Sequence, residues 1–418
     1  MQNRPPASAE RPYPCRVCRS EDVAPLLDFG QMPIAHRLLE RADAPEETFP
    51  FALSVCRRCG LMQIAEPIDA ETLYRGFNYN FSSWKPEPHR ADELALIREL
   101  AAPSSVAEIG TNEGLFLSEL RDAGVTTVAG LEPNPVCGRI ARERGLSIYE
   151  GMASVATAEQ MVADHGRFDT VVSRQVLEHV PGVDTFFATA RALVRDGGYL
   201  FIDCPDMDPA GALGDCSVLW EEHVTYYTRT TLEALLRANG FEPIAVRTYD
   251  YSGGALAILS RRSTASASAD LVFPEGVART ERFAARVREY GARLSAALAR
   301  ARENGIPAAI YGAGSRACTL TNGLRLPGLG WSIDDQRERH GKFLPGTRLE
   351  IRPSSSLDDG TGPLIVLLAV NNENEVRVRA NIAERTTRPL HVISTSGPAD
   401  IWSELARLEA AVDASCAV

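Results

Sequence analysis

The sequence lacks any apolar run approaching the ~20 residues that a membrane-spanning helix requires. Its N-terminal stretch, residues 1–15, also lacks the apolar core of a signal peptide. We therefore expect a cytoplasmic protein that has no membrane partner.

Positive charge is also in deficit. The chain has 44 Lys and Arg against 55 Asp and Glu, which gives a formal net charge of −11. It contains no long stretch that is rich in basic residues. Proteins that bind nucleic acids usually present a basic face to the phosphates. This deficit excludes nucleic acid as the main partner and is compatible with a small-molecule substrate that carries a phosphate group.

The remaining composition is that of an ordinary globular protein, and 418 residues are enough for two or three domains. Residues 13–80 surround two cysteine pairs and predict a small module. Residues 81–261 alternate β-rich and helical stretches, which predicts a mainly parallel sheet covered by helices. A turn-rich linker is expected at 262–276, followed by a helix at 277–303. The alternation then resumes, so 277–418 is predicted as a second Rossmann-like α/β domain.

The cysteines are arranged for metal binding rather than for disulfides. Because no export signal precedes them, two C-x2-C pairs indicate a metal site. Four thiolates, Cys15, Cys18, Cys56 and Cys59, complete a tetrahedral Zn²⁺ site without an open position, which predicts a structural role. Gly60 is suited to a left-handed conformation after the second pair. Four unligated core thiols and a redox-active pair are the alternatives.

Three segments of the central domain predict a nucleotide-type cofactor site. The first is a strand, tight turn and helix in VAEIGTNEGLF, and the second is an acid at the end of the next strand, 22 positions after the first glycine of the turn. An acid at this spacing binds ribose hydroxyls in nucleotide-binding α/β folds. The third is the loop after FDTVVSR. The predicted cofactor-binding residues are Glu108, Gly110, Asn112, Gly114, Glu132 and Gln175.

The turn lacks the three glycines of G-x-G-x-x-G, which makes a dinucleotide cofactor less favoured. The combination resembles the class I methyltransferases. This resemblance implies S-adenosylmethionine as cofactor, held by its amino-acid part at the turn and by its ribose at the acid.

Longer motifs extend the resemblance over nearly the whole chain. Both C-x2-C pairs, GQMPIAHRLL, YNFSS, EEHVTYYT, YGAGSR and GKFLPGT resemble the sugar C-methyltransferases of antibiotic deoxysugar pathways. Members of that family join a zinc domain, an S-adenosylmethionine domain and a C-terminal Rossmann-like domain. The resemblance implies a dTDP-linked 4-keto-6-deoxysugar that is methylated at C3.

The reaction requires a base for the C3 proton and stabilisation of the enolate oxygen. Histidine titrates near neutrality and is scarce here, with seven residues in the chain. By resemblance, His223 matches the general base, and the neighbouring Glu222 orients or polarises it. His179 is expected to face the methyl-transfer pocket, and Tyr79 to hold the keto oxygen. Substrate-binding residues are also expected in the same motif as Tyr79, at Ser82 and Ser83.

The sequence departs from the family pattern near the expected site. Trp220 occupies the usual tyrosine position and has no phenol to share a proton with an enolate. His36 replaces an asparagine, and 371–373 replace a Trp-Asn-Phe run. An O- or N-methyltransferase, which needs less enolate stabilisation, stays open, as does an inactive zinc-containing binding or scaffold protein.

The C-terminal domain contains a second strand, glycine turn and helix in AAIYGAGSRACTL. Such a turn binds phosphate at the helix N-terminus. The resemblance implies that this domain helps to bind the nucleotide of the substrate. A retained fold that serves only as a rigid wall is the alternative. The candidate substrate-binding residues are Trp220, Ser315, Arg316, Asp334 and Lys342.

Overall fold

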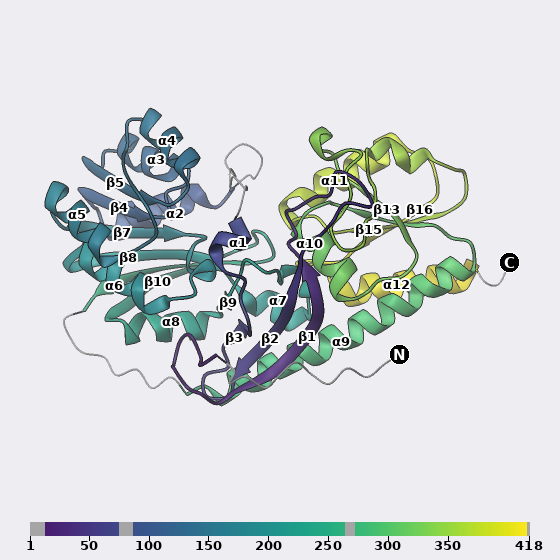
Figure 1. Cartoon of the computed structure of the whole chain (residues 1–418), viewed down its shortest axis with the longest axis horizontal. Helices are drawn as coiled ribbons and strands as arrows, with labels where there is room; N and C mark the ends of the chain where they lie inside the picture. The colour runs from purple at the N-terminus through teal and green to yellow at the C-terminus, as the bar shows by residue number, and fades with distance from the viewer. Residues whose placement is uncertain (1–12, 75–86, 264–271, 416–418) are drawn as a thin grey trace.

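The computed structural model describes residues 13–74, 87–263 and 272–415, which form an α/β protein with three sheets (Figure 1). The seven-stranded and five-stranded sheets lie at opposite ends of the molecule, and a ribbon formed by two long strands lies between them. Among the described residues, no helix is long and apolar enough to cross a membrane.

The N-terminal module is a four-stranded antiparallel sheet in the order β1-β2-β3-β9. Its fourth strand comes from the central domain, about 160 residues further along the chain. The predicted module 13–80 therefore holds only part of its own sheet. Its elements are β1 (Val23–Pro33), β2 (Thr48–Cys56), β3 (Met62–Ile64), β9 (Thr225–Tyr226) and the short helix α1 (Ala70–Tyr74).

The central domain has a seven-stranded sheet in the order β10-β11-β8-β7-β4-β5-β6. Strands β4 to β8 pair in parallel, and β10 and β11 add an antiparallel edge. The strands are β4 (Ser105–Ile109), β5 (Thr127–Glu132), β6 (Ser147–Glu150), β7 (Phe168–Arg174), β8 (Val194–Pro205), β10 (Phe241–Tyr249) and β11 (Ala255–Arg262). The helices are α2 (Arg90–Leu100), α3 (Leu115–Asp122), α4 (Pro135–Glu143), α5 (Val155–His165), α6 (Val183–Leu193), α7 (Met207–Leu213) and α8 (Arg229–Ala238).

Helix starts in this domain are set by local capping. The Asn134 side chain accepts hydrogen bonds from the first backbone N–H groups of α4, and Pro135 occupies the first turn, where its missing N–H costs nothing. Thr228 and Thr231 form a reciprocal capping box at the start of α8. These caps fix where the chain leaves the strand ends that carry the site.

The C-terminal domain has a fully parallel five-stranded sheet in the order β14-β13-β12-β15-β16. The long helix that was predicted from residue 277 begins one turn earlier. The elements are α9 (Pro274–Glu303), β12 (Ala308–Tyr311), α10 (Ser315–Cys318), β13 (Leu329–Ile333), β14 (Ile351–Arg352), β15 (Leu364–Leu368), α11 (Asn372–Arg385), β16 (Leu390–Ser394) and α12 (Ile401–Ser415).

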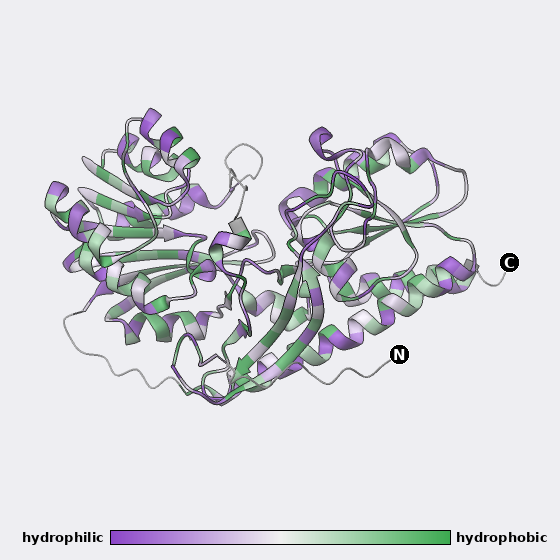
Figure 2. Ribbon diagram, viewed as in Figure 1, coloured by the Kyte–Doolittle hydropathy of each residue, from purple (hydrophilic) through white to green (hydrophobic). Residues whose placement is uncertain are grey.

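Helix α9 lies in a hydrophobic cluster to which all three parts of the chain contribute side chains. It runs beneath β1 and β2 toward the C-terminal sheet (Figure 1) and contacts α7, α12, β1 and β2. Leu294, Leu298 and Phe283 on α9 are almost fully buried in the same cluster as Leu53 of β2. Figure 2 shows hydrophobic strands inside and hydrophilic positions on the outer faces of the helices. Each fully buried side chain of this kind contributes roughly 1.5–3 kcal/mol of transfer free energy.

Candidate active site and metal centre

The four predicted metal ligands lie on two similar turns. The backbone N–H of Arg19 donates to the carbonyl of Cys15, and that of Gly60 donates to the carbonyl of Cys56. Both turns end in a left-handed residue, with φ of 61° at Arg19 and 73° at Gly60. The conformation expected for Gly60 is therefore observed, and the first turn achieves it without a glycine.

The cysteine geometry fits zinc. The Sγ atoms are 3.5 Å apart for Cys15 and Cys59 and 3.4 Å apart for Cys18 and Cys56, and all four lie within 4.8 Å of one another. Tetrahedral coordination with Zn–S bonds of ~2.3 Å places sulfurs about 3.8 Å apart. The four residues would hold the ion with no open position, so its chemistry there is structural.

The predicted cofactor turn follows β4 as expected. Gly110 and Gly114 have φ of 80° and 75°, which side chains with a Cβ rarely adopt. A Cβ on Gly110 would lie 2.3 Å from Cγ2 of Val176. The glycine therefore also lets the loop after β7 cross over the turn.

Glu132 ends β5 with both carboxylate oxygens held in place. Oε2 accepts from the backbone N–H of Asn112 at 2.7 Å, and Oε1 accepts from that of Asn134 at 2.8 Å. Burial raises the pKa of this carboxyl above its ordinary value, and the two backbone donors oppose that shift in part. Each oxygen keeps a second lone pair for a ribose hydroxyl, so the residues present fit the sugar of S-adenosylmethionine.

Glu108 is buried in the sheet, and Gln175 is hydrogen-bonded to a protein side chain. Glu108 is almost fully buried, and burial raises its pKa to about 8 although Arg174 opposes the shift. Gln175 has a left-handed φ of 53°, and its Nε2 donates to Oδ2 of Asp203 at 3.1 Å. Their cofactor-binding roles stay predictions.

His223 lies in the turn before β9 and is 6% exposed. Its ring is 4.1 Å from the Trp220 ring and 4.9 Å from the His179 ring between centroids. Nδ1 of His179 lies 2.9 Å from the carbonyl oxygen of Glu222, and because a carbonyl only accepts, this nitrogen carries the hydrogen. The fold thus brings three of the predicted residues together, with His223 buried and His179 and Trp220 partly exposed.

Glu222 reaches the N-terminal module. Its Oε1 lies 3.0 Å from Nδ1 of His36, and the Oε1 of the neighbouring Glu221 accepts from the backbone N–H of Ala35 at 2.7 Å. Both glutamates are buried, and burial raises the pKa of Glu221. His36 and Glu221 were not selected as site residues from the sequence. The only signal was that His36 departs from the family pattern.

The C-terminal domain holds the same loop from the other side. Nη1 of Arg316 donates to Oγ of Ser217 at 2.6 Å, and the Thr319 hydroxyl donates to the carbonyl of Leu219 at 2.5 Å. The backbone N–H of Gly397 donates to Asp215 at 3.0 Å. The segment that carries His223 is therefore fixed by contacts to all three parts of the chain.

These contacts revise the expectation for Arg316. Its guanidinium is 3% exposed and donates also to Asn371 and to the carbonyl of Ser252. A phosphate-binding arginine needs donors that face the ligand. Here the described donors hold the interface between two domains, so we propose a positioning role for Arg316, and its substrate-binding role stays an untested prediction.

Of the other residues predicted in this domain, Asp334 and Lys342 already have protein partners. Asp334 accepts from the backbone N–H groups of Ala313 and Gln336 at 2.9 Å each and pairs with Arg339 at 3.1 Å. Lys342 pairs with Glu40 at 2.8 Å. Ser315 opens α10, which has only four residues. Three further predicted site residues lie outside the described residues: Tyr79, Ser82 and Ser83.

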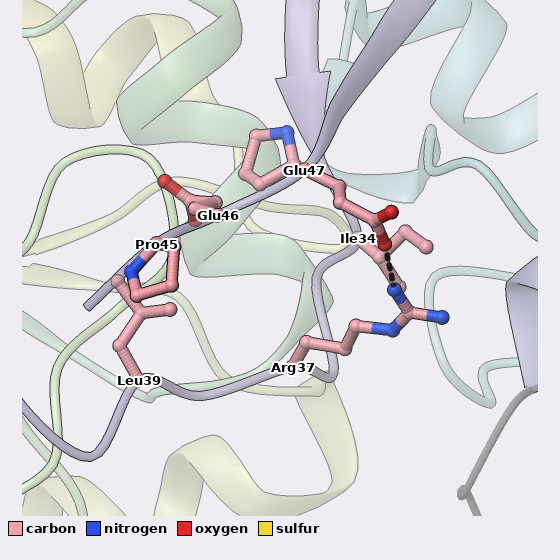
Figure 3. A pocket seen from close by; sticks show the side chains of 7 residues that line it. Ile34, Arg37, Leu39, Pro45, Glu46 and Glu47 are labelled. Carbon is pink, nitrogen blue, oxygen red and sulfur yellow. Dashed lines mark hydrogen bonds and ion pairs between the residues drawn. The ribbon is translucent and has the colours of Figure 1, made fainter.

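A small cavity of about 140 Å³ adjoins the His36 segment (Figure 3). Arg37 pairs with Glu47 across it at 2.9 Å, as the dashed line shows. Pockets for drug-sized ligands usually measure ~300–1,000 Å³. This cavity is too small for a nucleotide and does not mark the substrate site. It is lined by Pro33, Ile34, Arg37, Leu39, Pro45, Glu46 and Glu47.

Comparisons with known proteins agree with this division. A zinc binding domain model matches residues 15–74, a methyltransferase domain model matches 83–246, and a C-methyltransferase C-terminal domain model matches 273–392. The C-methyltransferase NovU of Streptomyces niveus is 28% identical over 388 residues, which are 87% of this chain and 90% of NovU.

More distant relatives match parts of the chain. A ubiquinone biosynthesis O-methyltransferase of Agrobacterium fabrum is 35% identical over 101 residues, which are 23% of this chain and 38% of the relative. A solved 1,6-didemethyltoxoflavin-N1-methyltransferase of Burkholderia thailandensis, with bound S-adenosylhomocysteine, has a TM-score of 0.38 and 17% identity. It covers 50% of this chain and 96% of its own.

Together, the cysteine centre, the cofactor turn and three consecutive domain matches confirm the resemblance that the sequence motifs indicate. The cofactors are S-adenosylmethionine in the central domain and a structural zinc ion in the N-terminal module. The chain is an S-adenosylmethionine-dependent methyltransferase in which matches to a zinc-binding domain, a methyltransferase domain and a C-methyltransferase C-terminal domain follow one another.

Proposed function

We propose that the protein methylates C3 of a nucleotide-linked 4-keto-6-deoxysugar, with His223 as the general base. The observation that carries this proposal is the buried His223, in ring contact with His179 and Trp220, on a loop fixed by all three domains. A rigid, water-poor setting is what proton abstraction next to a ketone requires.

His223 takes the C3 proton, and the electron pair left on the substrate is shared between C3 and the C4 oxygen as an enolate. When bound, S-adenosylmethionine supplies an electrophilic methyl group to that carbon. The His179 tautomer leaves its Nε2 without a hydrogen while the ring is neutral, so this ring can accept a hydrogen bond. The proton on His223 returns to solvent before the next turnover.

Glu222 and His36 form a second acid–base pair beside the base. Their atoms are 3.0 Å apart, and both side chains are largely shielded from water. Trp220 cannot donate a phenolic proton to the enolate, whereas an imidazole hydrogen-bonded to a carboxylate can exchange one. We propose that His36 and Glu222 take over this donor function in the present chain.

The nucleotide would lie against the C-terminal domain, on the glycine turn after β12 and the loop that carries Lys342. Ser315 at the start of α10 and Asp334 at the end of β13 flank this turn, as Asn112 and Glu132 flank the turn of the central domain. Lys342 would have to exchange Glu40 for a phosphate, which a surface ion pair worth about 0–1 kcal/mol allows.

A second candidate function is O- or N-methylation of a small-molecule intermediate. Trp220 favours it, because transfer to a heteroatom needs no phenolic group at the enolate oxygen.

The test is product analysis with S-adenosylmethionine labelled in its methyl carbon and a dTDP-linked 4-keto-6-deoxysugar as acceptor. We expect NMR to show the labelled methyl bonded to C3. A label bonded to oxygen or nitrogen would identify the second candidate. Absence of turnover with both dTDP- and UDP-linked acceptors would overturn the nucleotide-sugar proposal.

The base is tested separately by hydrogen exchange at C3 with S-adenosylhomocysteine in place of the methyl donor. The wild-type enzyme should wash deuterium out of a C3-labelled substrate, and His223→Asn should slow this at least ~100-fold. His165→Asn, at the end of α5 and outside the site, is the matched control. Near-normal exchange in His223→Asn would assign the base to another residue.

A further inference from the structure

A second group of metal-type ligands is buried between α2 and the sheet of the central domain. His89 is the N-cap of α2, Glu93 follows one turn later, and Asp203 lies near the carboxyl end of β8. His89 is 5% exposed, and Glu93 and Asp203 are fully buried. None of the three is a cysteine-site ligand or belongs to the His223 group.

The polar atoms of this group converge on a common point. Nε2 of His89 is 3.9 Å from Oε1 of Glu93 and 3.9 Å from Oδ2 of Asp203. The ring of His89 is held between Tyr249 and Tyr251, with centroid separations of 4.8 and 4.4 Å. The aromatic contacts fix the direction in which the imidazole points.

Several of these atoms have no hydrogen-bond partner within the part of the chain that the structure describes. They are both ring nitrogens of His89, Oε1 of Glu93 and Oδ1 of Asp203. Burying a polar group without a partner costs on the order of 1–3 kcal/mol each. Two of these atoms, Nε2 of His89 and Oε1 of Glu93, face the common point at 3.9 Å from each other, which indicates a missing ligand there.

The charge around this point is negative. Arg174 is the cation that faces it, with Nε 2.7 Å from Oε2 of Glu93. Its Nη2 is 3.3 Å from Glu87 and 3.9 Å from Asp203. One guanidinium therefore faces three carboxyl groups, which leaves an excess of two negative charges when all three are ionised and His89 is neutral. Arg174 uses the other oxygen of Glu93, so Oε1 stays directed at His89.

We propose that His89, Glu93 and Asp203 bind a divalent first-row transition-metal ion, at a site separate from the four-cysteine zinc centre. The charge of the ion matches the excess of two carboxylates. One imidazole and two carboxylates are ligands that Zn²⁺, Mn²⁺ or Fe²⁺ accept, whereas Mg²⁺ and Ca²⁺ prefer oxygen alone.

The distances agree with such an ion. The three ligand atoms lie within 4.8 Å of one another. An atom equidistant from them would be roughly 2.3–2.5 Å from each, so a shift of a few tenths of an ångström reaches the ~2.0–2.2 Å of zinc–nitrogen and zinc–oxygen bonds.

The ion would lie next to the cofactor loop. Gln175 leaves the end of β7 and donates to the same carboxylate of Asp203 at 3.1 Å. A metal-bound Asp203 would fix the orientation of Gln175, because the outer partners of a ligand carboxylate are themselves ordered by the metal. The site would thus support the loop that runs on to His179. This inference does not depend on the sugar substrate.

The test is metal analysis of the full-length wild-type protein, purified without chelator, incubated with Zn²⁺, Mn²⁺ or Co²⁺ and then desalted. We expect one further ion per chain beyond the zinc of the cysteine centre. In the Mn²⁺ sample, electron paramagnetic resonance should show bound manganese without release of zinc. A wild-type protein that retains a single zinc ion per chain under all three conditions would overturn the proposal. The polar atoms of the cluster would then be satisfied by water or by bound protons.

Variants locate the additional ion. Asp203→Asn and His89→Gln should each lose the further ion and keep the cysteine-bound zinc. Glu99→Gln, an exposed position on the same helix, is the matched control and should keep both. Circular dichroism checks that each variant is folded. Folded Asp203→Asn and His89→Gln variants that still bind the additional ion would contradict the assigned ligands.

Discussion

Glu108 shows how a buried side chain couples stability to pH. Burial raises its pKa to about 8, well above the ordinary value of 4.5 for a glutamic acid, and its Oε2 has no hydrogen-bond partner among the described residues. The native state therefore keeps a proton that the unfolded chain releases between these two values. Because the native state binds more protons, stability falls as pH rises through this window and levels off above it.

We predict that Glu108→Gln removes this contribution, since an amide does not titrate. The free energy of unfolding of the variant should rise relative to that of the wild type between pH 5 and pH 8, with a slope of at most ~1.4 kcal/mol per pH unit. Scanning calorimetry across this range measures it. Glu159→Gln, an exposed position on α5, is the control. A constant difference between variant and wild type would contradict the buried, protonated carboxyl.

His36 replaces the asparagine of the family pattern, and the structure gives it a side-chain partner. Its Nδ1 contacts Glu222, the residue adjacent to the proposed base. We predict that His36→Asn lowers kcat about 10-fold with little change in KM, because the proposed proton donation to the enolate is made in the transition state and not in the bound ground state. Steady-state kinetics with His165→Asn as control measures this. An unchanged kcat would remove His36 from the mechanism.

At the scale of elements, the segment from Asp215 to β9 connects the three domains. Its last strand completes the N-terminal sheet, and its first residues are bound by the C-terminal domain. An element held at both ends keeps His223 within the small positional tolerance that catalysis allows.

Arg316→Lys tests the support of this segment. Lysine keeps the charge but cannot reproduce the fork that binds Ser217, Asn371 and Ser252 together. We predict a loss of about 1–3 kcal/mol in stability and a reduced kcat, with KM for the substrate nearly unchanged. Thermal unfolding and kinetics measure both. A raised KM with normal stability would instead restore the nucleotide-binding role first expected for Arg316.

The second cysteine turn packs directly on the start of α9. A Cβ on Gly60 would lie 2.4 Å from the backbone carbonyl carbon of Gly276, and φ at Gly60 is 73°. Gly124 also has a positive φ, of 104°, but no atom within 4 Å of an added Cβ.

We predict that Gly60→Ala destabilises the protein more than Gly124→Ala. Both variants pay for the left-handed backbone, on the order of 1 kcal/mol. Only Gly60→Ala also forces α9 away from the zinc module. The difference between their melting temperatures measures this contact, and equal destabilisation would show that α9 adjusts freely.

At the scale of the whole molecule, zinc stabilises more than its own module. The backbone N–H of Phe273 donates to the carbonyl of Arg58, and the Thr280 hydroxyl donates to that of Gly60. These bonds join the cysteine turns to the helix that carries the C-terminal domain. Loss of the metal should therefore loosen a distant part of the fold.

We predict that chelation of zinc under reducing conditions lowers the melting temperature and increases amide hydrogen exchange in the first turns of α9 before its C-terminal turns. Mass spectrometry of α9 peptides measures the effect, and added zinc should reverse it. Uniform exchange along α9 in the zinc-free protein would mean that the module and the helix are independent.

Much of the architecture follows from the sequence, because its signals are local. A C-x2-C pair closes a turn over four residues, and a strand followed by a glycine turn presents its backbone to a cofactor whatever surrounds it. The cysteine centre, the turn at Gly110, the acid Glu132 and the order of the domains were predicted on this basis and are observed.

Only the tertiary structure decided which partners the site residues have. The contacts of Glu222 with His36, of Arg316 with Ser217 and of β9 with β3 join residues about 100 to 190 positions apart. Such pairings depend on how three domains pack around α9. Residue spacing in the sequence predicts local structure and not contacts between residues this far apart. The sequence by itself therefore determined the chemistry available to this protein, and domain packing determined which side chains support His223.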